Sequence, residues 1–526
     1  MIKIRTSSGK WESFCGQIET FLAADFTEQR IDGRTVRGYR SPDSPALWIR
    51  DHSDIVRAGK YFESDLKSAV ECFAHFQARD GRLFDHVLTS PLKGSSEQEN
   101  WEKWVRVPVE ADVEFRFVKA VHQAWQASGD LKWLKRYLPA CDQALMYSLQ
   151  HPWRWDKENQ LVKRPYTIDT WDFDYTAGRA PWLNFQIDDH TFWGITHADN
   201  SGVYEAAQIL ANWYALTGDA QAEEKWRRKA EGIRKRANDL LFNGAFYTHF
   251  HKLTPVTIPG VDEASQLSLS TPMAINRGLA THEFAVSILQ EYQRRRKSTD
   301  AFAEWFGIDP PFPDGIFGDE KLVGGAYING GIFPLVGGEL ARAAFTHGFE
   351  DYGISILEQY REMIHESNAT YLWYFPDGTA SSEETSTSPE ALPTDGWGSS
   401  AMLYGFVEGL CGVVDEGAGF ESVSCTPRWA ATDEKEIEIE ISYAASGATF
   451  GYRYQHDAEQ KEIHFSGNFA KSSVRLSLLI PEGAVLRHAR RDGQDVPAQV
   501  SHIEGSTYVD FESPFSGDVS LNIRYA

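Results

Sequence analysis

The sequence predicts a mainly helical domain followed by a β-sandwich. From about residue 50 to 415, apolar residues recur at i, i+3 and i+4 between loops rich in Gly, Pro and Asp, a spacing typical of helices. After about residue 420, short runs alternate apolar and polar residues with turn residues between them, as strands do. Helices first and strands afterwards favour two domains over an α/β sheet, and 526 residues suffice for both.

These patterns define the elements in chain order. Residues 1–44 form a lead-in of irregular or short-strand character. The helical domain spans residues 45–416, and its clearest helices are SDLKSAVECFAHFQA, FRFVKAVHQAWQA, VYEAAQILANWYALTG and YGISILEQYREMIHES. The β domain spans residues 417–526 and contains EIEIEISYAASGATFGYRYQ, SVRLSLLIPEG and STYVDFESPFSGDVSLNIRY. A domain of about 100 residues is usual for a β-sandwich.

A Gly-Asp pair recurs between helical stretches. Gly129-Asp130 and Gly218-Asp219 each separate two such stretches, and the segment 348–351 is a looser match. The gaps between the aspartates are 89 and 132 residues, near two and three times a unit of about 44, which is the length of a helical hairpin with a long loop. The spacing therefore predicts repeated helical hairpins.

Composition excludes several classes of protein. The net charge of −23, from 75 acidic and 52 basic residues, argues against nucleic acid or another polyanion as a partner. Because the chain has no run of 18 apolar residues and no apolar segment near its start, we expect no membrane span and no signal peptide. Five scattered cysteines without metal-ligand spacing indicate free thiols and a cytoplasmic protein.

The sequence predicts no metal and no cofactor. His52, His86, His190 and His197 do not form a recognisable metal-binding set, and they are expected to be hydrogen-bonded structural residues. No Gly-rich phosphate loop follows a strand, and no Ser nucleophile elbow occurs. The oligomeric state is not indicated by any pattern in the chain.

Two acidic segments that contain tryptophan lie about 210 residues apart. YTIDTWDFDY places Asp169, Asp172 and Asp174 among aromatic rings, and SSEETSTSPEALPTDGWGSS places four carboxylates in a loop of small residues. Hydrolysis of a glycosidic bond uses two carboxyl groups, one to protonate the leaving oxygen and one to activate water. Aromatic rings offer apolar faces to a sugar and raise the pKa of an acid that they desolvate. With 17 Trp in the chain, the pattern indicates a small carbohydrate as substrate.

Four segments in the same order resemble glycosidases built on an (α/α)6 toroid of helical hairpins, the trehalase, processing α-glucosidase and neutral invertase families. LWIRDHSD is similar to the Trp-x-Arg-Asp segment of neutral invertases, and DTWDFDYTAGRAPW to the Ser-Gly-Trp-Asp segment of trehalases. YINGGIFP resembles Tyr-x-Asn-Gly-Gly-x-Trp-Pro, with Phe333 where Trp is usual. EETSTSPEALPTDGWGSSA resembles the segment that begins with the catalytic base. The likeness spans roughly residues 45–410.

The resemblance implies an inverting mechanism with named residues. Asp172 matches the general acid, and Asp174 is the reserve. The base is Glu383 or Glu384, since the family segment opens Glu-x-Tyr and this chain reads Glu-Glu-Thr. Without the resemblance, the aspartates would be interpreted as a solvated turn or a helix N-cap, and the glutamates as a solvated loop.

Other residues are predicted to bind the sugar. Arg50 with Asp51 and Asp54 offers charge-assisted hydrogen bonds to hydroxyls, and an internal Arg–Asp ion pair is the competing explanation. Gly330 lets the backbone approach a ligand, although a plain tight turn would also use glycine. The full set of predicted substrate-binding residues is Trp48, Arg50, Asp51, Asp54, Trp171, Asp174, Trp193, Tyr327, Asn329, Gly330, Glu390 and Trp397.

The sequence thus predicts an inverting, exo-acting glycoside hydrolase for a small neutral glycoside or short oligosaccharide. The alternatives are an inverting glycoside phosphorylase, a sugar epimerase or lyase on a similar toroid, and a non-catalytic sugar-binding protein. The Ser/Thr-rich stretch 385–388 is compatible with a phosphate pocket. The β domain has no evident exposed aromatic platform, so it is expected to brace the helical domain.

Overall fold

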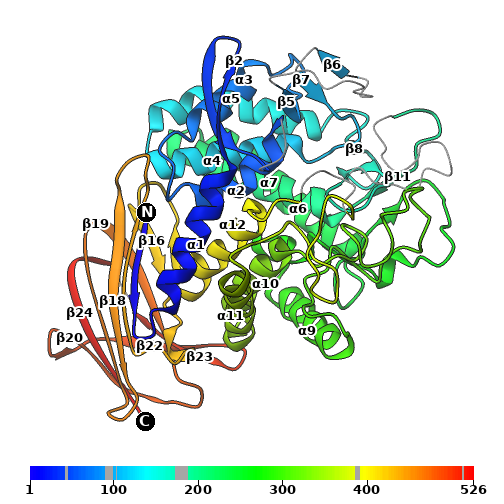
Figure 1. Cartoon of the computed structure of the whole chain (residues 1–526). Coiled ribbons are helices and arrows are strands. Elements are labelled where there is room, and N and C mark those ends of the chain that lie inside the picture. The colour runs from blue at the N-terminus through cyan, green and yellow to red at the C-terminus, as the bar shows by residue number, and fades with distance from the viewer. Residues whose placement is uncertain (42–45, 89–98, 102–103, 172–186, 386–390, 512–513) are drawn as a thin grey trace.

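The computed structural model describes residues 1–41, 46–88, 99–101, 104–171, 187–385, 391–511 and 514–526. Figure 1 shows a helical domain beside a β domain, and both chain ends lie at the β domain. Helices predominate up to residue 410 and strands after it, and a large, mainly antiparallel sheet forms the β domain, which also includes a strand from residues 2–6 at the start of the chain. Among the described residues, no helix combines the length and apolar character needed to cross a membrane.

Within the described residues, six helices form a closed ring. Each packs against the next, and the last packs against the first. These inner helices are α2 (Ile49–Gly59), α4 (Val113–Ser128), α6 (His197–Thr217), α8 (Thr271–Asn276), α10 (Pro334–Thr346) and α12 (Gly396–Tyr404). Most of their residues are buried, including the charged residues of α2, because each helix is enclosed by neighbours on several sides.

Six further helices pack around the ring. The outer helices are α1 (Lys10–Asp25), α3 (Lys67–His75), α5 (Leu131–Ser148), α7 (Ala220–Leu241), α9 (His282–Ser298) and α11 (Glu350–Ser367). Helix α5 contacts α4 and α6, α9 contacts α8 and α10, and α1 contacts α11 and α12. Residues 10–25, predicted to belong to the lead-in, therefore complete the outer layer.

The Gly-Asp pairs join inner helices to outer ones. Gly129 and Gly218 end α4 and α6 in the left-handed conformation that favours glycine. Asp130 and Asp219 then cap α5 and α7, accepting hydrogen bonds from Trp133 N and Ala222 N at 3.0 Å each. The recurring pair is thus the signal of a tight inner-to-outer turn, as the predicted hairpins require.

Helices α10 and α12 approach closely at Gly338. A Cβ atom there would overlap the backbone of Ala401, which cannot rotate away as a side chain does. We expect Gly338→Ala to lower the free energy of unfolding by about 1–3 kcal/mol in urea titrations. Gly16→Ala is the matched control, because this glycine of α1 has open space around it. This substitution should raise the free energy of unfolding by about 0.4–1 kcal/mol. Equal effects of the two substitutions would contradict the close approach.

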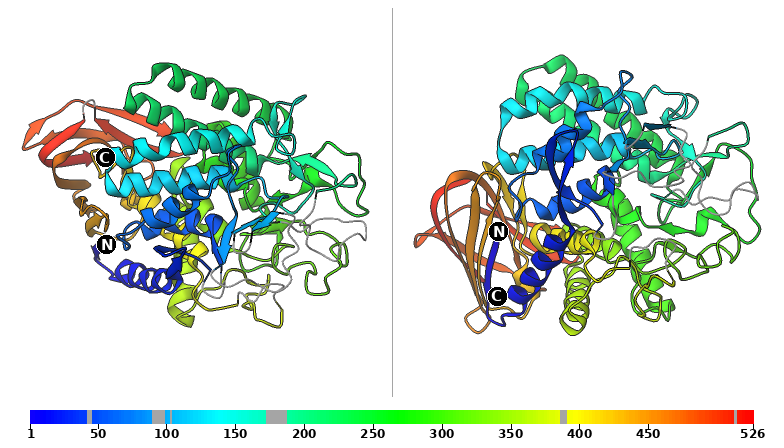
Figure 2. Two further views of the ribbon diagram at one scale, coloured as in Figure 1. Left: turned by 90° about the horizontal axis from the view of Figure 1, so that it is seen from above. Right: turned by 45° about the horizontal axis from the view of Figure 1, so that its top comes forward.

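The β domain combines strands from both ends of the chain. Its main path runs in the order β1 (Ile2–Thr6), β17 (Glu436–Ser442), β18 (Thr449–Asp457), β19 (Glu462–Ile480), β24 (Phe515–Tyr525), β20 (Leu486–Arg491) and β21 (Gln494–Asp495). Off this path lie β15 (Val413–Asp415), β16 (Ser422–Cys425), β22 (Ala498–Ile503) and β23 (Ser506–Phe511). Strand β1 pairs antiparallel with β17, with Ile4 opposite Ile439. Figure 2 shows this domain on one side of the helices in both views.

Smaller strands occur in the loops of the helical domain. They are β2 (Phe26–Ile31), β3 (Arg34–Tyr39), β4 (Ala46–Trp48), β5 (His86–Leu88), β6 (Glu99–Trp101), β7 (Trp104–Arg106), β8 (Trp155–Asp156), β9 (Leu161–Val162), β10 (Arg164–Pro165), β11 (Trp193–Ile195), β12 (His251–Lys252), β13 (Leu267–Ser268) and β14 (Ile308–Asp309). The four strands β4, β5, β7 and β6 form one sheet just before α2 and α4. These strands fix the loops that precede the inner helices.

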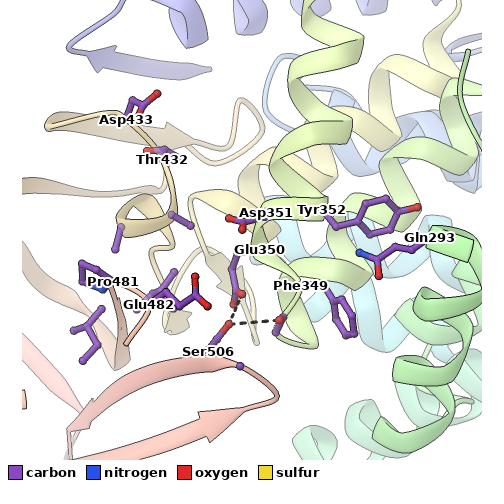
Figure 3. A pocket seen from close by; sticks show the side chains of 16 residues that line it. Gln293, Phe349, Glu350, Asp351, Tyr352, Thr432, Asp433, Pro481, Glu482 and Ser506 are labelled. Carbon is purple, nitrogen blue, oxygen red and sulfur yellow. Dashed lines mark hydrogen bonds between the residues drawn. The ribbon is translucent and has the colours of Figure 1, made fainter. Parts of the chain in front are cut away.

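The two domains meet at a polar seam. A hollow of about 550 Å³ lies there between the start of α11 and the strands of the β domain. Figure 3 shows the carboxylate of Glu350 directed at Ser506, and Glu350 accepts hydrogen bonds from Ser506 Oγ and Tyr508 Oη. Because both hydrogen bonds to this carboxylate cross the seam, it joins α11 to the β22–β23 hairpin. The seam adjoins the turn from α10 to α11, at the C-terminal end of α10.

The five cysteines are all buried and none forms a disulfide. The prediction that the cysteines form no disulfide frame is therefore confirmed. Burial raises the pKa of the thiols of Cys15 and Cys425, so these side chains are held in their neutral form.

Candidate functional site

The N-terminal ends of the inner helices gather at one end of the ring. Arg50, in the first turn of α2, contacts Asp112, the residue before α4. Asp169 accepts hydrogen bonds from Ser270, the residue before α8, at 2.8 Å from the backbone N and 3.0 Å from Oγ. The ring of Trp171 contacts Trp397 in the first turn of α12. Loops far apart in the sequence thus meet where the helix dipoles are positive.

Arg50 forms the first half of a buried ionic cluster. Its Nε and Nη2 donate to the two carboxylate oxygens of Asp112 at 2.8 and 2.9 Å, a bidentate pairing. Its Nη2 also lies 2.9 Å from Oε2 of Glu110. Only 9% of Arg50 and 3% of Glu110 is exposed. The guanidinium therefore holds the loop before α4 against the start of α2.

Arg164 forms the second half. It is fully buried, and its Nη2 lies 3.4 Å from Oε2 of Glu110 while its Nη1 lies 3.6 Å from Oδ1 of Asp199. Its Nη2 also donates to the carbonyl oxygen of Trp171 at 3.0 Å. Arg164 thus fixes the position of the Trp171 backbone relative to Glu110 and α6. We name Arg50, Glu110, Asp112, Arg164 and Asp199 the arginine–carboxylate cluster.

The carboxyl groups of this end differ in how readily they ionise. Burial raises the pKa of Asp199 to about 6, although Arg164 opposes the shift, and burial also raises the pKa of Glu110. For Asp112, burial is outweighed by Arg50 and Arg116, so its pKa falls well below the usual range. Burial raises the pKa of the nearby Asp85 to about 7 against the effect of Arg106. Carboxyl groups with raised and with lowered pKa values therefore lie at the same end of the ring.

An aromatic group lies beside the cluster. Trp171 is half-buried, and its ring centroid lies 5.9 Å from Tyr327, 5.8 Å from Phe333 and 6.1 Å from Trp397. These rings come from the loop after β10 and from the starts of α10 and α12. The predicted residues Trp171, Tyr327 and Trp397 are thus brought together, next to the predicted Arg50.

Three further predicted residues lie at the start of α2. The ring of Trp48 contacts that of His86, with the centroids 3.8 Å apart and the ring planes tilted by 37°. Asp51 accepts hydrogen bonds from Ser41 N at 3.2 Å and Ser41 Oγ at 2.7 Å, and burial raises its pKa. Asp54 forms an ion pair with Arg116. The internal ion pairs that the sequence left as an alternative are therefore present, for Arg50 and for Asp54.

Other predicted residues have structural surroundings. Asn329 donates to Phe312 O and Leu322 O at 3.1 Å and accepts from Phe312 N at 2.7 Å, so its side chain holds a loop together. Gly330 has a φ of 102°, the left-handed region that favours glycine. Trp193 lies on β11 with the ammonium of Lys163 at 4.8 Å from its ring centroid.

The predicted catalytic residues lie on two loops, which the structure describes only in part. Asp172, Asp174 and Glu390 lie outside the described residues. Glu383 and Glu384 are exposed on the loop that leads to α12, where Lys321 Nζ donates to Glu383 O at 3.3 Å. Asp395, at the end of this loop, caps α12 by accepting from Gly398 N at 2.7 Å.

The sequence did not single out Glu110, Asp112 or Arg164. Glu110 and Asp112 directly precede a helix, a position where acidic residues usually serve as caps or favour the helix dipole. The available signal was the density of acidic residues ahead of several inner helices, which becomes informative only when those helices are known to start at the same end.

Deeper in the ring, Glu339 of α10 joins three inner helices. It accepts hydrogen bonds from Arg57 Nη1 of α2 and, at 2.5 Å, from Asn276 Nδ2 of α8. Burial is outweighed by Arg57 and Asn276, which lower the pKa of Glu339 from 4.5 to about 2. A lowered carboxyl pKa gives stability that is complete above pH 4.5 and is lost as the pH falls towards 2.

We expect Glu339→Gln to lower the free energy of unfolding at pH 7 by about 3–5 kcal/mol, because Arg57 remains buried without its counter-ion. The deficit should shrink as the pH falls below 4.5, since the parent protein then loses the same ionic contact. Urea unfolding at pH 7 and at lower pH measures both values. Glu366→Gln, on the exposed end of α11, is the control and should change stability by less than about 0.5 kcal/mol.

No protein-family model matches the sequence, and no curated protein matches it. Solved structures match in fold. The alpha-L-rhamnosidase from Dictyoglumus thermophilum has a TM-score of 0.60 and 11% identity, covering 99% of this chain and 50% of its own. The Streptomyces avermitilis alpha-L-rhamnosidase complexed with L-rhamnose has a TM-score of 0.58 and 14% identity, covering 99% and 42%.

A third structure is similar over a shorter part of this chain. The GH63 mannosylglycerate hydrolase from Thermus thermophilus in complex with glucose has a TM-score of 0.50 and 13% identity, and the match covers 75% of this chain and 99% of that one. This chain spans about half the length of the rhamnosidases, 50% and 42%. At such identities the likeness concerns the fold, so the chain shares the fold of these glycoside hydrolases.

Proposed function

We propose that this protein is an inverting glycoside hydrolase that acts from the end of a small neutral glycoside or short oligosaccharide. The observation that carries the proposal is the arginine–carboxylate cluster beside Trp171, at the end of the ring where all the inner helices begin. The cluster holds the loops at this end of the ring in place, and the half-buried ring of Trp171 offers an apolar face to a sugar. The shared fold with rhamnosidases and a mannosylglycerate hydrolase supports the reaction class.

The proposed acid is Asp172, and the proposed base is Glu383 or Glu384. Asp172 follows Trp171 directly in the sequence, and Arg164 donates a hydrogen bond to the carbonyl oxygen of Trp171. Glu383 and Glu384 are exposed and are therefore accessible to water. Inversion requires about 6.5–9.5 Å between the two carboxyl groups, enough for a water molecule. The acid would protonate the leaving oxygen while the base takes a proton from the attacking water.

The proposal includes the architecture implied by the family resemblance. We propose that the closed ring of six helices, with six helices around it, is an (α/α)6 toroid. The segments that resemble trehalases, processing α-glucosidases and neutral invertases lead into α2, α10 and α12 or adjoin the cluster, which supports inversion. The buried free thiols support a cytoplasmic location.

The test is a substrate screen with purified protein. α- and β-linked disaccharides and aryl glycosides, including α-L-rhamnosides and mannosylglycerate, are incubated with the protein while proton NMR records the first anomer released. Release of the inverted anomer supports the proposal. Release of the retained anomer contradicts inversion, and turnover only after inorganic phosphate is added indicates a phosphorylase instead.

A further inference from the structure

The outward face of the large sheet carries an elongated hollow. Two adjoining depressions of about 620 and 340 Å³ share Glu438 and Arg453 in their linings. Together they cross five neighbouring strands, β1, β17, β18, β19 and β24. We name these two depressions the sheet groove. It lies on strands, whereas the arginine–carboxylate cluster lies at the helix starts of the other domain.

The floor of the groove is made by small residues. The strand register places Glu438 opposite Arg453, Arg453 opposite Ser466, and Ser466 opposite Ser520. Gly451 lies two residues before Arg453 on the same strand and therefore on the same face. A solvated sheet face usually carries long polar side chains at such positions. Here a glycine and two serines leave a trough between longer side chains.

The walls of the groove are polar and carry both donors and acceptors. On one side, Arg453 Nη2 lies 2.9 Å from Glu438 Oε1, with both side chains largely exposed. On the other side, Asn468 Nδ2 donates to Asp518 Oδ1 at 2.6 Å. Ser466 and Ser520 lie on the same strands as Asn468 and Asp518, two residues along each strand and therefore on the same face. Guanidinium, amide, carboxylate and hydroxyl groups in one trough match a ligand whose groups also donate and accept at short intervals.

Charge and shape narrow the ligand class. Five carboxylates line the groove, those of Glu436, Glu438, Glu440, Asp492 and Asp518, and the whole chain carries −23, so a polyanion would be repelled. A trough that continues across five strands suits an extended chain better than a compact molecule.

We propose that the sheet groove binds a linear, uncharged polysaccharide. The sequence alone predicted that the β domain only braces the helical domain, because no aromatic platform was evident. The groove needs no such platform, since hydroxyl groups are matched by polar side chains along its length. Binding there is separate from hydrolysis at the ring, so the two proposals stand or fall independently.

Native gel electrophoresis tests the proposal with defined probes. The full-length protein is run in gels containing dextran, pullulan, galactomannan or hydroxyethylcellulose, and in one containing polygalacturonate. We expect retardation by at least one neutral polysaccharide and none by polygalacturonate. Ser466→Tyr fills the trough and should weaken the apparent affinity at least five-fold. Ser501→Tyr is the matched control, on β22 and outside the groove, and should be retarded like the parent protein.

Several results would overturn the proposal. They are the absence of retardation in every neutral gel, retardation by polygalacturonate in its place, and equal retardation of the two tyrosine variants. If Ser466→Tyr lowers Tm, the double substitution Asn468→Ala with Asp518→Ala decides the matter, since both side chains are exposed. Hydrolysis of a small glycoside should be unchanged in all these variants, which separates the groove from the proposed active site.

Discussion

Replacing Asp172 by Asn should lower kcat/KM for glycosides with a poor leaving group by about 10²–10⁴-fold, the usual contribution of a general acid. Asparagine keeps the size and removes the proton that the leaving oxygen needs. Because asparagine has nearly the same size and shape as aspartate, the substitution should leave Tm nearly unchanged. Steady-state kinetics and thermal unfolding together measure both quantities.

Substrates with different leaving groups sharpen this test. A glycosyl fluoride needs little protonation to depart, so the loss in Asp172→Asn should be much smaller for the fluoride than for a disaccharide. Asp189→Asn, at an exposed position later in the same segment, is the matched control. A loss of less than about ten-fold, or an equal loss on both substrates, would remove Asp172 from the role of acid. A larger loss in Asp174→Asn would assign the role to Asp174.

Arg50→Met should produce the largest loss of stability at the site, about 3–5 kcal/mol in the free energy of unfolding. The substitution leaves Asp112 and Glu110 buried without the guanidinium that pairs with both. Hydrolysis should fall as well, because the starts of α2 and α4 lose their common ionic contact. Urea unfolding and kcat/KM at one pH measure the two effects.

The matched control is an arginine on the surface. Arg228 pairs with Glu224 at 3.8 Å, with 74% and 67% of the side chains exposed, so Arg228→Met should cost at most about 0.5 kcal/mol. Arg50→Met combined with Asp112→Asn should recover part of the loss, since one of the stranded charges is then absent. Equal stability of the two methionine variants would mean that the cluster contributes no more than a surface pair.

The fold was predictable where local chemistry determines it. Apolar stripes identified long helices such as α6, and the Gly-Asp pairs marked the turns into α5 and α7. Strand β1 was not predictable, because five residues that read Ile-Lys-Ile-Arg-Thr alternate like many exposed segments and their partner lies at the other end of the chain.

The site was predictable only in part, for a related reason. Trp171, Arg50 and Trp397 were identified through motifs within single segments, and the structure brings them to one end of the ring. Glu110 and Arg164 can be recognised as part of a cluster only when their contact is known, and they are 54 positions apart in the sequence. Asn329 was also identified through a motif, and in the structure its amide holds a loop together through hydrogen bonds with Phe312.

The pairing of β1 with β17 makes the helical domain an insertion within the β domain. Lys3 and Glu440 are separated by 437 positions yet form an ion pair. During synthesis, the partner of β1 emerges roughly 20–90 s after β1 itself at ordinary translation rates. The first strand must therefore wait, unpaired, while the ring of helices assembles. No single cut between the domains can release them as two intact pieces, so the β domain is complete only when the helical domain has already brought its two halves together.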